Sequence, residues 1–150
     1  MKHSAPEIKM YNDGYKAQVL DVWASSVQAT HEFLSPSDFE TIKTVVANID
    51  FIDLNVYCMV DKLKIVAFIA VVEGKVEMLF VSPSYIGKGI GKTLMKFAMV
   101  ELGANKVDVN EQNVKALNFY QKLGFEIASR TAKDGLGMNY PILQMKLKQA

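Results

Sequence analysis

The stretch from Val81 to Leu94, VSPSYIGKGIGKTL, constrains the fold more than any other part of the chain. It joins an apolar segment typical of a strand to residues with helical spacing, so strand, turn and helix follow one another within a few residues. Gly87, Gly89 and Gly91 remove side chains from this connection. Its backbone amides can therefore approach a ligand closely, and the start of a helix favours negative charge. The stretch predicts a cradle for an anion.

Two common phosphate-binding patterns do not fit this stretch. Gly91-Lys92-Thr93 supplies the end of a P-loop, but Ile86 stands where the first glycine of that motif belongs. The dinucleotide-binding pattern Gly-x-Gly-x-x-Gly fails when counted from either Gly87 or Gly89. A nucleotide phosphotransferase is therefore disfavoured, and an anion cradle of another kind remains.

The composition fits one domain that spans residues 1–150. Half of the 150 residues are hydrophobic, which is enough for a genuine core. The 17 basic and 16 acidic residues give a formal net charge of +1, which argues against a nucleic-acid partner. No signal peptide and no run long enough to span a bilayer is visible, so we expect a cytoplasmic protein without a membrane partner.

The cysteine and histidine content favours neither a disulfide nor a metal site. Cys58 is the only cysteine and lies in the alternating apolar run LNVYCMV. A buried core residue is its expected role, and a nucleophile is the alternative. His3 and His31 are the only histidines and show no metal-ligand spacing, so we expect no metal.

Hydrophobic periodicity predicts a mixed α/β layer domain. The expected strands are Glu7–Tyr11, Leu54–Val60, Lys64–Val72, Lys75–Val81, Lys106–Val109, Phe125–Arg130 and Leu143–Leu147. The expected helices run from Gly14 to about Thr30, from Ser35 or Ser37 through Ile49, from Ile90 to near Gly103, and from Val114 to Leu123. The strand before the glycine loop and the strand at 106–109 should be parallel neighbours joined by a crossover helix. Ligands collect at the carboxyl ends of such strands, where the anion cradle also lies.

Two motifs resemble the GNAT superfamily of acetyl-CoA-dependent N-acetyltransferases. LFVSPSYIGKGIGKTL is similar to the strand-loop-helix motif of that family, and NEQNVKALNFYQKLGF, from Asn110 to Phe125, is similar to the segment that follows it. Together with the element order, the likeness covers nearly the whole chain and implies a small, single-domain member of bacterial type. It implies a central mixed, mostly antiparallel sheet, splayed at the strand before the glycine loop and flanked by helices.

The resemblance implies that acetyl-CoA is the cosubstrate. Backbone amides across Ile86 to Gly91 would hold its pyrophosphate, Lys88 and Lys92 would add positive charge, and the pantetheine arm would lie along Glu77–Val81. The family commonly has Arg or Gln at the position of Ile86, whose only donor is its backbone N–H. The implied cofactor-binding residues are Leu79, Val81, Ile86, Gly87, Lys88, Gly89, Ile90, Gly91, Lys92, Asn113, Phe119 and Tyr120.

The resemblance also implies direct attack of a primary amine in a ternary complex. Tyr120, within NFYQKLGF, would protonate the departing thiolate, although a core tyrosine is the alternative. The Leu79 amide would polarise the thioester carbonyl. Glu77 is expected on the face of Leu79 by period-two alternation and would act as general base, directly or through water. A half-exposed polar residue is the alternative for Glu77, because a water chain could also remove the proton.

The acceptor remains open at the level of sequence. His31, Glu32 and Phe33 interrupt the first helical region where the family builds its acceptor pocket, and Tyr140 lies in the loop segment KDGLGMNYP. These four residues are the candidate substrate-binding residues, although His31 also fits a hydrogen-bonded histidine at a helix end. Protein N-termini, lysine side chains, amino acids and small amines all stay possible, as does a homodimer. A non-catalytic acyl-CoA-binding sensor of the same fold is the alternative function.

Overall fold

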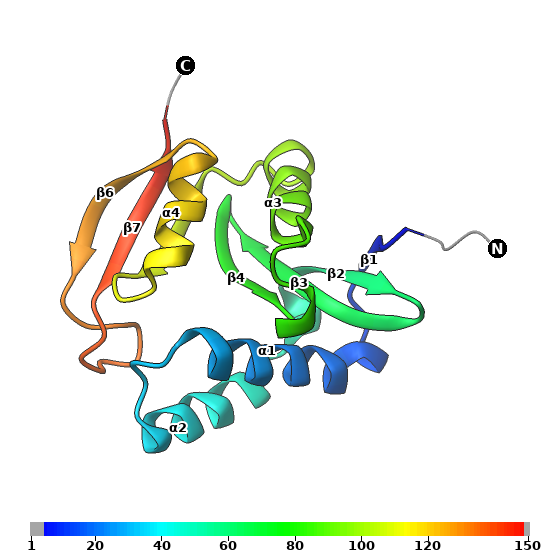
Figure 1. Cartoon of the computed structure of the whole chain (residues 1–150), viewed down its shortest axis with the longest axis horizontal. Coiled ribbons are helices and arrows are strands. Elements are labelled where there is room, and N and C mark those ends of the chain that lie inside the picture. The colour runs from blue at the N-terminus through cyan, green and yellow to red at the C-terminus, as the bar shows by residue number, and fades with distance from the viewer. Residues whose placement is uncertain (1–4, 149–150) are drawn as a thin grey trace.

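The computed structural model describes residues 5–148, which form one seven-stranded sheet with helices on both faces (Figure 1). The strands are β1 (Glu7–Met10), β2 (Asn55–Asp61), β3 (Lys64–Val72), β4 (Lys75–Val81), β5 (Lys106–Asn110), β6 (Phe125–Thr131) and β7 (Ile142–Leu147). The helices are α1 (Lys16–Thr30), α2 (Pro36–Ala47), α3 (Ile90–Glu101) and α4 (Val114–Lys122), with short 3-10 turns η1 (Asp13–Tyr15), η2 (Phe51–Asp53) and η3 (Pro83–Tyr85). Every strand and helix expected from the sequence is present, with ends shifted by at most two residues.

The strand order across the sheet is β1-β2-β3-β4-β5-β7-β6. The neighbouring strands are antiparallel except for β4 and β5, which are parallel and connected through α3. The expectation of a mixed, mostly antiparallel sheet with one parallel crossover is therefore confirmed. The turn between β2 and β3 is tight, and Lys62 and Leu63 adopt left-handed backbone angles, with φ of 51° and 67°.

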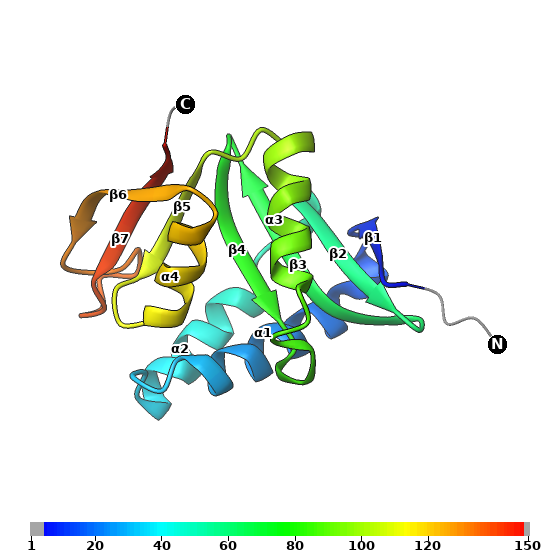
Figure 2. The ribbon, with the colours of Figure 1, turned by 45° about the horizontal axis from the view of Figure 1, so that its top comes forward.

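Strand β3 lies between β2 and β4 and is buried on both faces. All five residues from Val66 to Ala70 have 0% exposed surface. Phe68 and Ala70 belong to the core beneath α1 and α2, whereas Ala67 and Ile69 belong to the core beneath α3 and α4. The strand can be a continuous apolar run because both of its faces are covered by helices (Figure 2).

Helices α1 and α2 cover one face of the sheet and contact each other through aromatic rings. Trp23 and Phe39 stack with ring centroids 5.6 Å apart. Helix α2 begins as the sequence predicts, because the Ser35 side chain accepts a hydrogen bond from the Asp38 amide at 3.1 Å and Pro36 occupies the first turn. This capping determines where α2 begins.

Cys58 lies in β2, within the core beneath α1 and α2, and has 0% exposed surface. Burial raises the pKa of its thiol to about 12, so the thiolate is not populated at neutral pH. The prediction of a core cysteine is confirmed.

The part of the chain that the structure describes contains no helix that is both long and apolar enough to cross a membrane. Between residues 5 and 148 there is also no group of three or more His, Cys, Asp or Glu side chains that could hold a metal ion. His3 lies outside the described residues.

Candidate active site

Strands β4 and β5 separate after a short paired stretch. Their parallel pairing ends at Val76 and Val107, whereas β4 continues to Val81 beside β3 and β5 continues to Asn110 beside β7. Figure 2 shows the two strands diverging towards α1. The backbone groups on their facing edges therefore lack a strand partner past this point, and an extended ligand can hydrogen-bond to them as an added strand would.

A pocket of about 520 Å³ lies at this opening. Its walls come from the end of α1, from β4, from the glycine loop with the start of α3, from the end of β5 and from α4. The predicted site residues that line it are His31, Glu77, Leu79, Val81, Ile86, Gly87, Gly89, Ile90, Gly91, Lys92, Asn113, Phe119 and Tyr120. The predicted site residues that do not line it are Glu32, Phe33, Lys88 and Tyr140.

The glycine loop presents backbone rather than side chains to this pocket. Gly87 and Gly89 have φ of +83° and +79°, and a Cβ on either would meet no atom within 4 Å. Gly89 caps α3 without a side-chain hydrogen bond, so the first-turn amides of α3 have no acceptor within the helix. The Ile86 amide is different, because it donates to the Pro83 carbonyl at 3.3 Å. The free amides of the cradle therefore begin after Ile86, one residue later than the sequence predicts.

The two lysines of the loop have different positions. Lys92, in the first turn of α3, lines the pocket. Lys88 instead places its Nζ over the Tyr85 ring, 5.1 Å from the centroid, and the Tyr85 hydroxyl donates to Asp61 at 2.7 Å. Of the two, only Lys92 brings its positive charge to the pocket wall.

Asn113 and Phe119 form the α4 side of the pocket. Asn113 is the N-cap of α4, and its side-chain oxygen accepts the Ala116 amide at 3.2 Å. This bond leaves the side-chain NH₂ group of Asn113 to donate to a ligand. Phe119 lies against the glycine loop, since a Cβ on Gly91 would be 3.6 Å from its ring. The absence of a side chain at Gly91 therefore keeps the helix start open beside this ring.

Tyr120 is the buried tyrosine of the pocket wall, with 7% of its surface exposed. Its ring meets those of Phe119 and Phe125 edge-on, with centroids 5.1 Å and 6.0 Å away. Burial raises the pKa of the Tyr120 phenol well above its ordinary value of 10.0. The hydroxyl therefore keeps its proton at neutral pH and can act as a proton donor.

A β-bulge changes the local pattern around Glu77. The register with β3 skips Glu77, which lies between the paired residues Val76 and Met78. Val76 and Leu79 belong to the same core, so the strict alternation used to predict the face of Glu77 does not hold across the bulge. Glu77 nevertheless lines the pocket together with Leu79.

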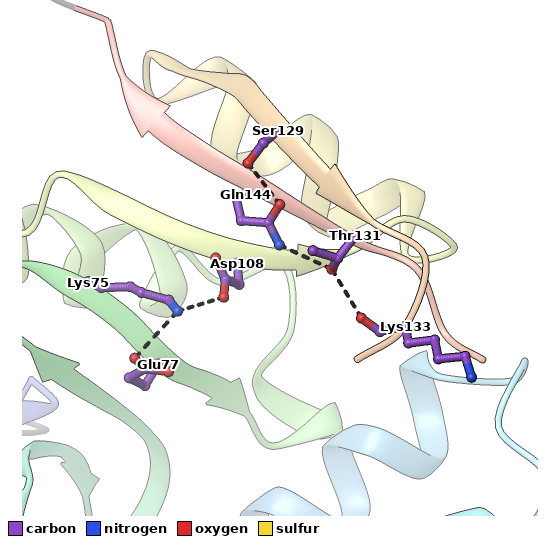
Figure 3. A network of polar contacts seen from close by, with 7 residues as sticks. All are labelled: Lys75, Glu77, Asp108, Ser129, Thr131, Lys133 and Gln144. Atoms are coloured by element: carbon purple, nitrogen blue, oxygen red, sulfur yellow. Dashed lines mark hydrogen bonds and ion pairs between the residues drawn. The ribbon is translucent and has the colours of Figure 1, made fainter. Parts of the chain in front are cut away.

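Lys75 links Glu77 to Asp108 across the fork between β4 and β5 (Figure 3). Its Nζ lies 2.6 Å from Asp108 Oδ2 and 3.6 Å from Glu77 Oε1. The hydrogen bond to Asp108 is the largest cause that raises the pKa of Lys75. Because the Lys75 and Asp108 side chains are 33% and 34% exposed, solvent screens this pair, and such pairs contribute at most about 1 kcal/mol. The cluster lies across the fork and places a cation beside the Glu77 carboxylate.

The loop between β6 and β7 is held by its own side chains. Asp134 accepts hydrogen bonds from the amides of Leu136 and Met138 at 3.0 Å and 2.9 Å. At the start of the loop, Thr131 donates to the Lys133 carbonyl at 3.0 Å and accepts from Gln144 at 3.3 Å, as Figure 3 shows. These hydrogen bonds stabilise the conformation of the loop on the side that leads to its contact with α2.

Tyr140 connects this loop to α2. Its hydroxyl donates to the Asp38 carboxylate and accepts from the Ser35 amide at 3.4 Å. The Phe33 ring packs against the rings of both Tyr140 and His31, with centroid distances of 6.0 Å and 5.2 Å. Phe33 and Tyr140 therefore stand behind His31 rather than in the pocket lining. Glu32, the fourth predicted acceptor residue, is exposed to solvent.

His31 is the C-terminal cap of α1 and lines the pocket. Its Nδ1 lies 2.8 Å from Thr30 Oγ1. Burial lowers the pKa of the imidazole below its ordinary value of 6.5. His31 is therefore hydrogen-bonded at a helix end and also lines the pocket, and its role in substrate binding stays a prediction.

Six polar pocket residues were missed at the level of sequence. They are Ser26 and Thr30 of α1, Tyr85 of η3, Asp108 and Asn110 of β5, and Lys115 of α4. The side-chain oxygen of Asn110 is buried and has no hydrogen-bond partner among residues 5–148. Its place at the carboxyl end of a parallel strand was the signal that could have identified it. Ser26 and Thr30 carry no comparable local signal, because their position depends on how α1 crosses the sheet.

Comparison with known proteins identifies the family. A family model described as an acetyltransferase (GNAT) domain matches residues 53–127. The peptidyl-lysine N-acetyltransferase YjaB of Salmonella typhimurium is 34% identical over 130 residues, which are 85% of this chain and 88% of the relative. The solution structure of apo-form YjaB from Escherichia coli has a TM-score of 0.88 at 28% identity and covers 98% of this chain and 100% of that one.

A more distant structure shares the fold. The PaiA N-acetyltransferase of Thermoplasma acidophilum, solved in complex with coenzyme A, has a TM-score of 0.74 at 22% identity, with 95% of this chain and 99% of that one covered. The glycine loop, the splayed parallel pair and these similarities agree with the resemblance seen in the two sequence motifs. The chain belongs to the GNAT family of acetyltransferases.

Proposed function

We propose that this protein, acting as a single N-acetyltransferase domain, transfers the acetyl group of acetyl-CoA to lysine side chains of proteins or peptides by direct attack in a ternary complex. The observation that carries the proposal is the continuity of one pocket from the glycine loop, past Tyr120, to the polar residues of α1 and β5. Family membership supports acetyl-CoA as the cosubstrate. The names of the YjaB relatives, which are peptidyl-lysine N-acetyltransferases, support lysine as the acceptor.

The residues present fit coenzyme A. The amides that follow Ile86, the N-terminus of α3 and the Lys92 ammonium offer donors and positive charge to a pyrophosphate. Lys88, held over Tyr85, adds charge nearby. The Asn113 NH₂ group and the Phe119 ring would contact the cofactor from α4. When bound, acetyl-CoA supplies an acetyl group activated as a thioester.

The unpaired edge of β4 would hold the pantetheine arm. Leu79 and Val81 line the pocket past the point where β4 and β5 separate. Their backbone groups can pair with the amides of the arm in the manner of an added strand. The Leu79 amide would stabilise negative charge on the carbonyl oxygen during transfer, a contribution of roughly 3 kcal/mol in comparable sites. The buried Tyr120 hydroxyl would give its proton to the departing thiolate.

The other end of the pocket suits a cationic amine. Glu77 and Asp108 bring two carboxylates to the lining, and the buried Asn110 oxygen needs an N–H or O–H donor. A lysine ammonium supplies both the positive charge and three donors. The role of Glu77 as general base stays a prediction from the sequence, and the Lys75 ammonium lies 3.6 Å from its carboxylate.

The test is turnover of purified protein on defined amines. Acetyl-CoA is mixed with a peptide that carries one lysine and a blocked N-terminus, and product mass and thiol release are followed together. The matched control peptide has arginine in place of lysine. Acetylation of the lysine peptide alone supports the proposal. Tight coenzyme A binding without turnover on lysine peptides, free N-termini or small amines would instead support the acyl-CoA sensor.

A further inference from the structure

The hydroxyl of Thr30 has one proton and two close neighbours. Its Oγ1 lies 2.7 Å from the Ser26 carbonyl oxygen and 2.8 Å from His31 Nδ1. A carbonyl oxygen can only accept, and two oxygens at 2.7 Å without a proton between them would repel each other. The Thr30 proton therefore points to Ser26, and Thr30 Oγ1 must accept a hydrogen bond from His31.

This bond fixes the tautomer of His31. If Nδ1 carries the proton donated to Thr30, then Nε2 of the neutral ring carries a lone pair. His31 lines the same pocket as Tyr120, and Phe33 packs against its ring with centroids 5.2 Å apart. The geometry thus holds an imidazole with a free acceptor nitrogen at the polar end of the pocket.

The electrostatic surroundings keep this ring neutral. Burial lowers the pKa of His31 below its ordinary value of 6.5, so little imidazolium is present at pH 7. The nearest acid along the chain, Glu32, is exposed. Asp38 on α2 is engaged by Tyr140. The other titratable side chains that line the pocket are Glu77, Tyr85, Lys92, Asp108, Lys115 and Tyr120.

We propose that His31 Nε2 accepts the proton of the attacking lysine amine, and that Thr30 is the positioning residue that holds the ring in the required tautomer. The proposal rests on the proposed acetyl transfer to lysine. The bound lysine ammonium first gives one proton to water. As the neutral amine nitrogen bonds to the acetyl carbon, its N–H becomes acidic and the proton passes to Nε2. The carbon–sulfur bond breaks and the sulfur takes a proton from Tyr120, which regains one from water, while His31 returns its proton to water.

His31 differs from Glu77 in its capacity to serve as this base. The Glu77 carboxylate lies 3.6 Å from the Lys75 ammonium, so it already has a cationic partner. The contacts of the His31 ring with Thr30 and Phe33 bring no cation to its lone pair. A general base of this kind typically contributes about 100-fold or more to the rate.

The first test reads the tautomer directly, without turnover. Long-range nitrogen–proton correlation spectra of isotope-labelled protein distinguish Nδ1–H from Nε2–H rings. His3 and His31 are the only histidines, so the His31→Gln spectrum assigns the signals. The expected result is an Nδ1–H ring with a pKa below 6.5, preserved in Thr30→Ser and mixed between tautomers in Thr30→Val. An Nε2–H ring in the wild-type protein would overturn the proposal.

The second test reads the base in the pH profile. With a lysine peptide, protonation of the lysine amine already lowers kcat/KM about tenfold per pH unit below the pKa of that amine, in every variant. Below the pKa of His31 the wild-type fall should steepen by a further tenfold per unit, because the protonated ring cannot accept a proton. His31→Gln should lower kcat roughly 100-fold and remove this steepening. Glu77→Gln should keep the steepening and raise KM instead. A steepening that persists in His31→Gln would overturn the proposal.

The base role of His31 and the proposed acetyl transfer to lysine can be rejected by different results. A wild-type protein that acetylates lysine but has the wrong His31 tautomer rejects the His31 role alone. A wild-type protein that binds coenzyme A and acetylates no amine rejects the proposed function, and the base role is rejected with it.

Discussion

One end of the pocket is formed mainly by backbone groups, and the other end is formed mainly by side chains. The end at which we propose that coenzyme A binds, the cofactor end, uses the backbone of one continuous strand-loop-helix segment, in which Gly87 and Gly89 contribute only amides and shape. The acceptor end uses side chains from segments far apart in the chain, and the Tyr140–Asp38 contact alone joins positions 102 residues apart. Backbone amides bind an anion whatever the neighbouring side chains are, whereas the acceptor end changes with every substitution. The comparison explains why the glycine-loop end resembles the family motif, and why we expect the other end to determine the substrate.

The largest effect should come from disrupting the backbone end. Gly89→Val places a β-branched residue at φ +79°, where L-residues are strained by at least about 1 kcal/mol, and puts a side chain over the cradle. We expect coenzyme A affinity to fall roughly 100-fold, the loss of one or two charge-assisted hydrogen bonds. Titration calorimetry measures this change.

A matched control separates strain from binding. Gly103→Val creates the same type of strain at φ +65°, just after α3 and outside the pocket. Both variants should lose similar thermal stability, and only Gly89→Val should lose affinity. If Gly89→Val bound coenzyme A with wild-type affinity, the glycine loop would not be the cofactor end of the pocket.

The next largest effect should come from the residue between the two ends. Tyr120→Phe removes the proton donor and keeps the buried ring, so kcat should fall roughly 100-fold while coenzyme A affinity stays within about twofold. Tyr57→Phe is the control, because Tyr57 packs on Phe97 at 4.9 Å and lies outside the pocket lining. A wild-type rate in Tyr120→Phe would reject the acid role.

The raised pKa of Tyr120 also gives a pH prediction with a definite sign. An acid must be protonated to act, and burial keeps the Tyr120 pKa above 10.0. The wild-type rate should therefore show no loss from this group as the pH rises from 7 to 10. A fall in kcat near pH 8 that is absent in Tyr120→Phe would contradict this assignment.

A smaller effect should follow when the acceptor end alone is loosened. Tyr140→Phe removes the hydrogen bonds of Tyr140 to Asp38 and Ser35 and leaves the ring against Phe33. A net loss of about 1 kcal/mol for these two exposed or part-buried hydrogen bonds predicts a KM for the lysine peptide roughly 5-fold higher. Steady-state kinetics should show an unchanged KM for acetyl-CoA. A change in the KM for acetyl-CoA alone would contradict the proposed division between the two ends of the pocket.

The smallest expected effect is a gain in coenzyme A affinity from a substitution at the cofactor end. Ile86 is 51% exposed and its amide is already bonded to Pro83, so its side chain gives the anion no donor. Ile86→Gln adds an exposed amide group and should tighten coenzyme A binding about 3-fold, since such a bond is worth roughly 0.5–1 kcal/mol. Ile127→Gln, at a 47% exposed position on β6, is the control and should change nothing. Weaker binding in Ile86→Gln would contradict the expectation.

The fold and the position of the glycine loop could be predicted from the sequence because both depend on local sequence patterns. Periodicity and glycines placed the strands, the helices and the loop after Val81 within two residues of their observed ends. The bulge at Glu77 was not predictable, because it arises from pairing between β3 and β4 rather than from either strand alone. The differing positions of Lys88 and Lys92 also depend on a partner, since Tyr85 holds only the first.

The acceptor end could be predicted only in part. His31, Phe33 and Tyr140 were singled out as one group, and the structure brings their rings into one row, although only His31 reaches the pocket. Asn110 and Thr30 were not found, because their roles depend on which polar atoms stay unpaired or paired after packing. Such pairing is a property of the folded chain.

The buried Cys58 has a practical consequence for enzymology. It is the only cysteine of the chain, it has 0% exposed surface, and its pKa is raised to about 12. Thiol-reactive dyes attack thiolates that solvent can reach, so the folded protein should give no colour with them. Free coenzyme A released by the reaction should then be the sole chromogenic thiol in a continuous assay, and a slow rise in background would report unfolding.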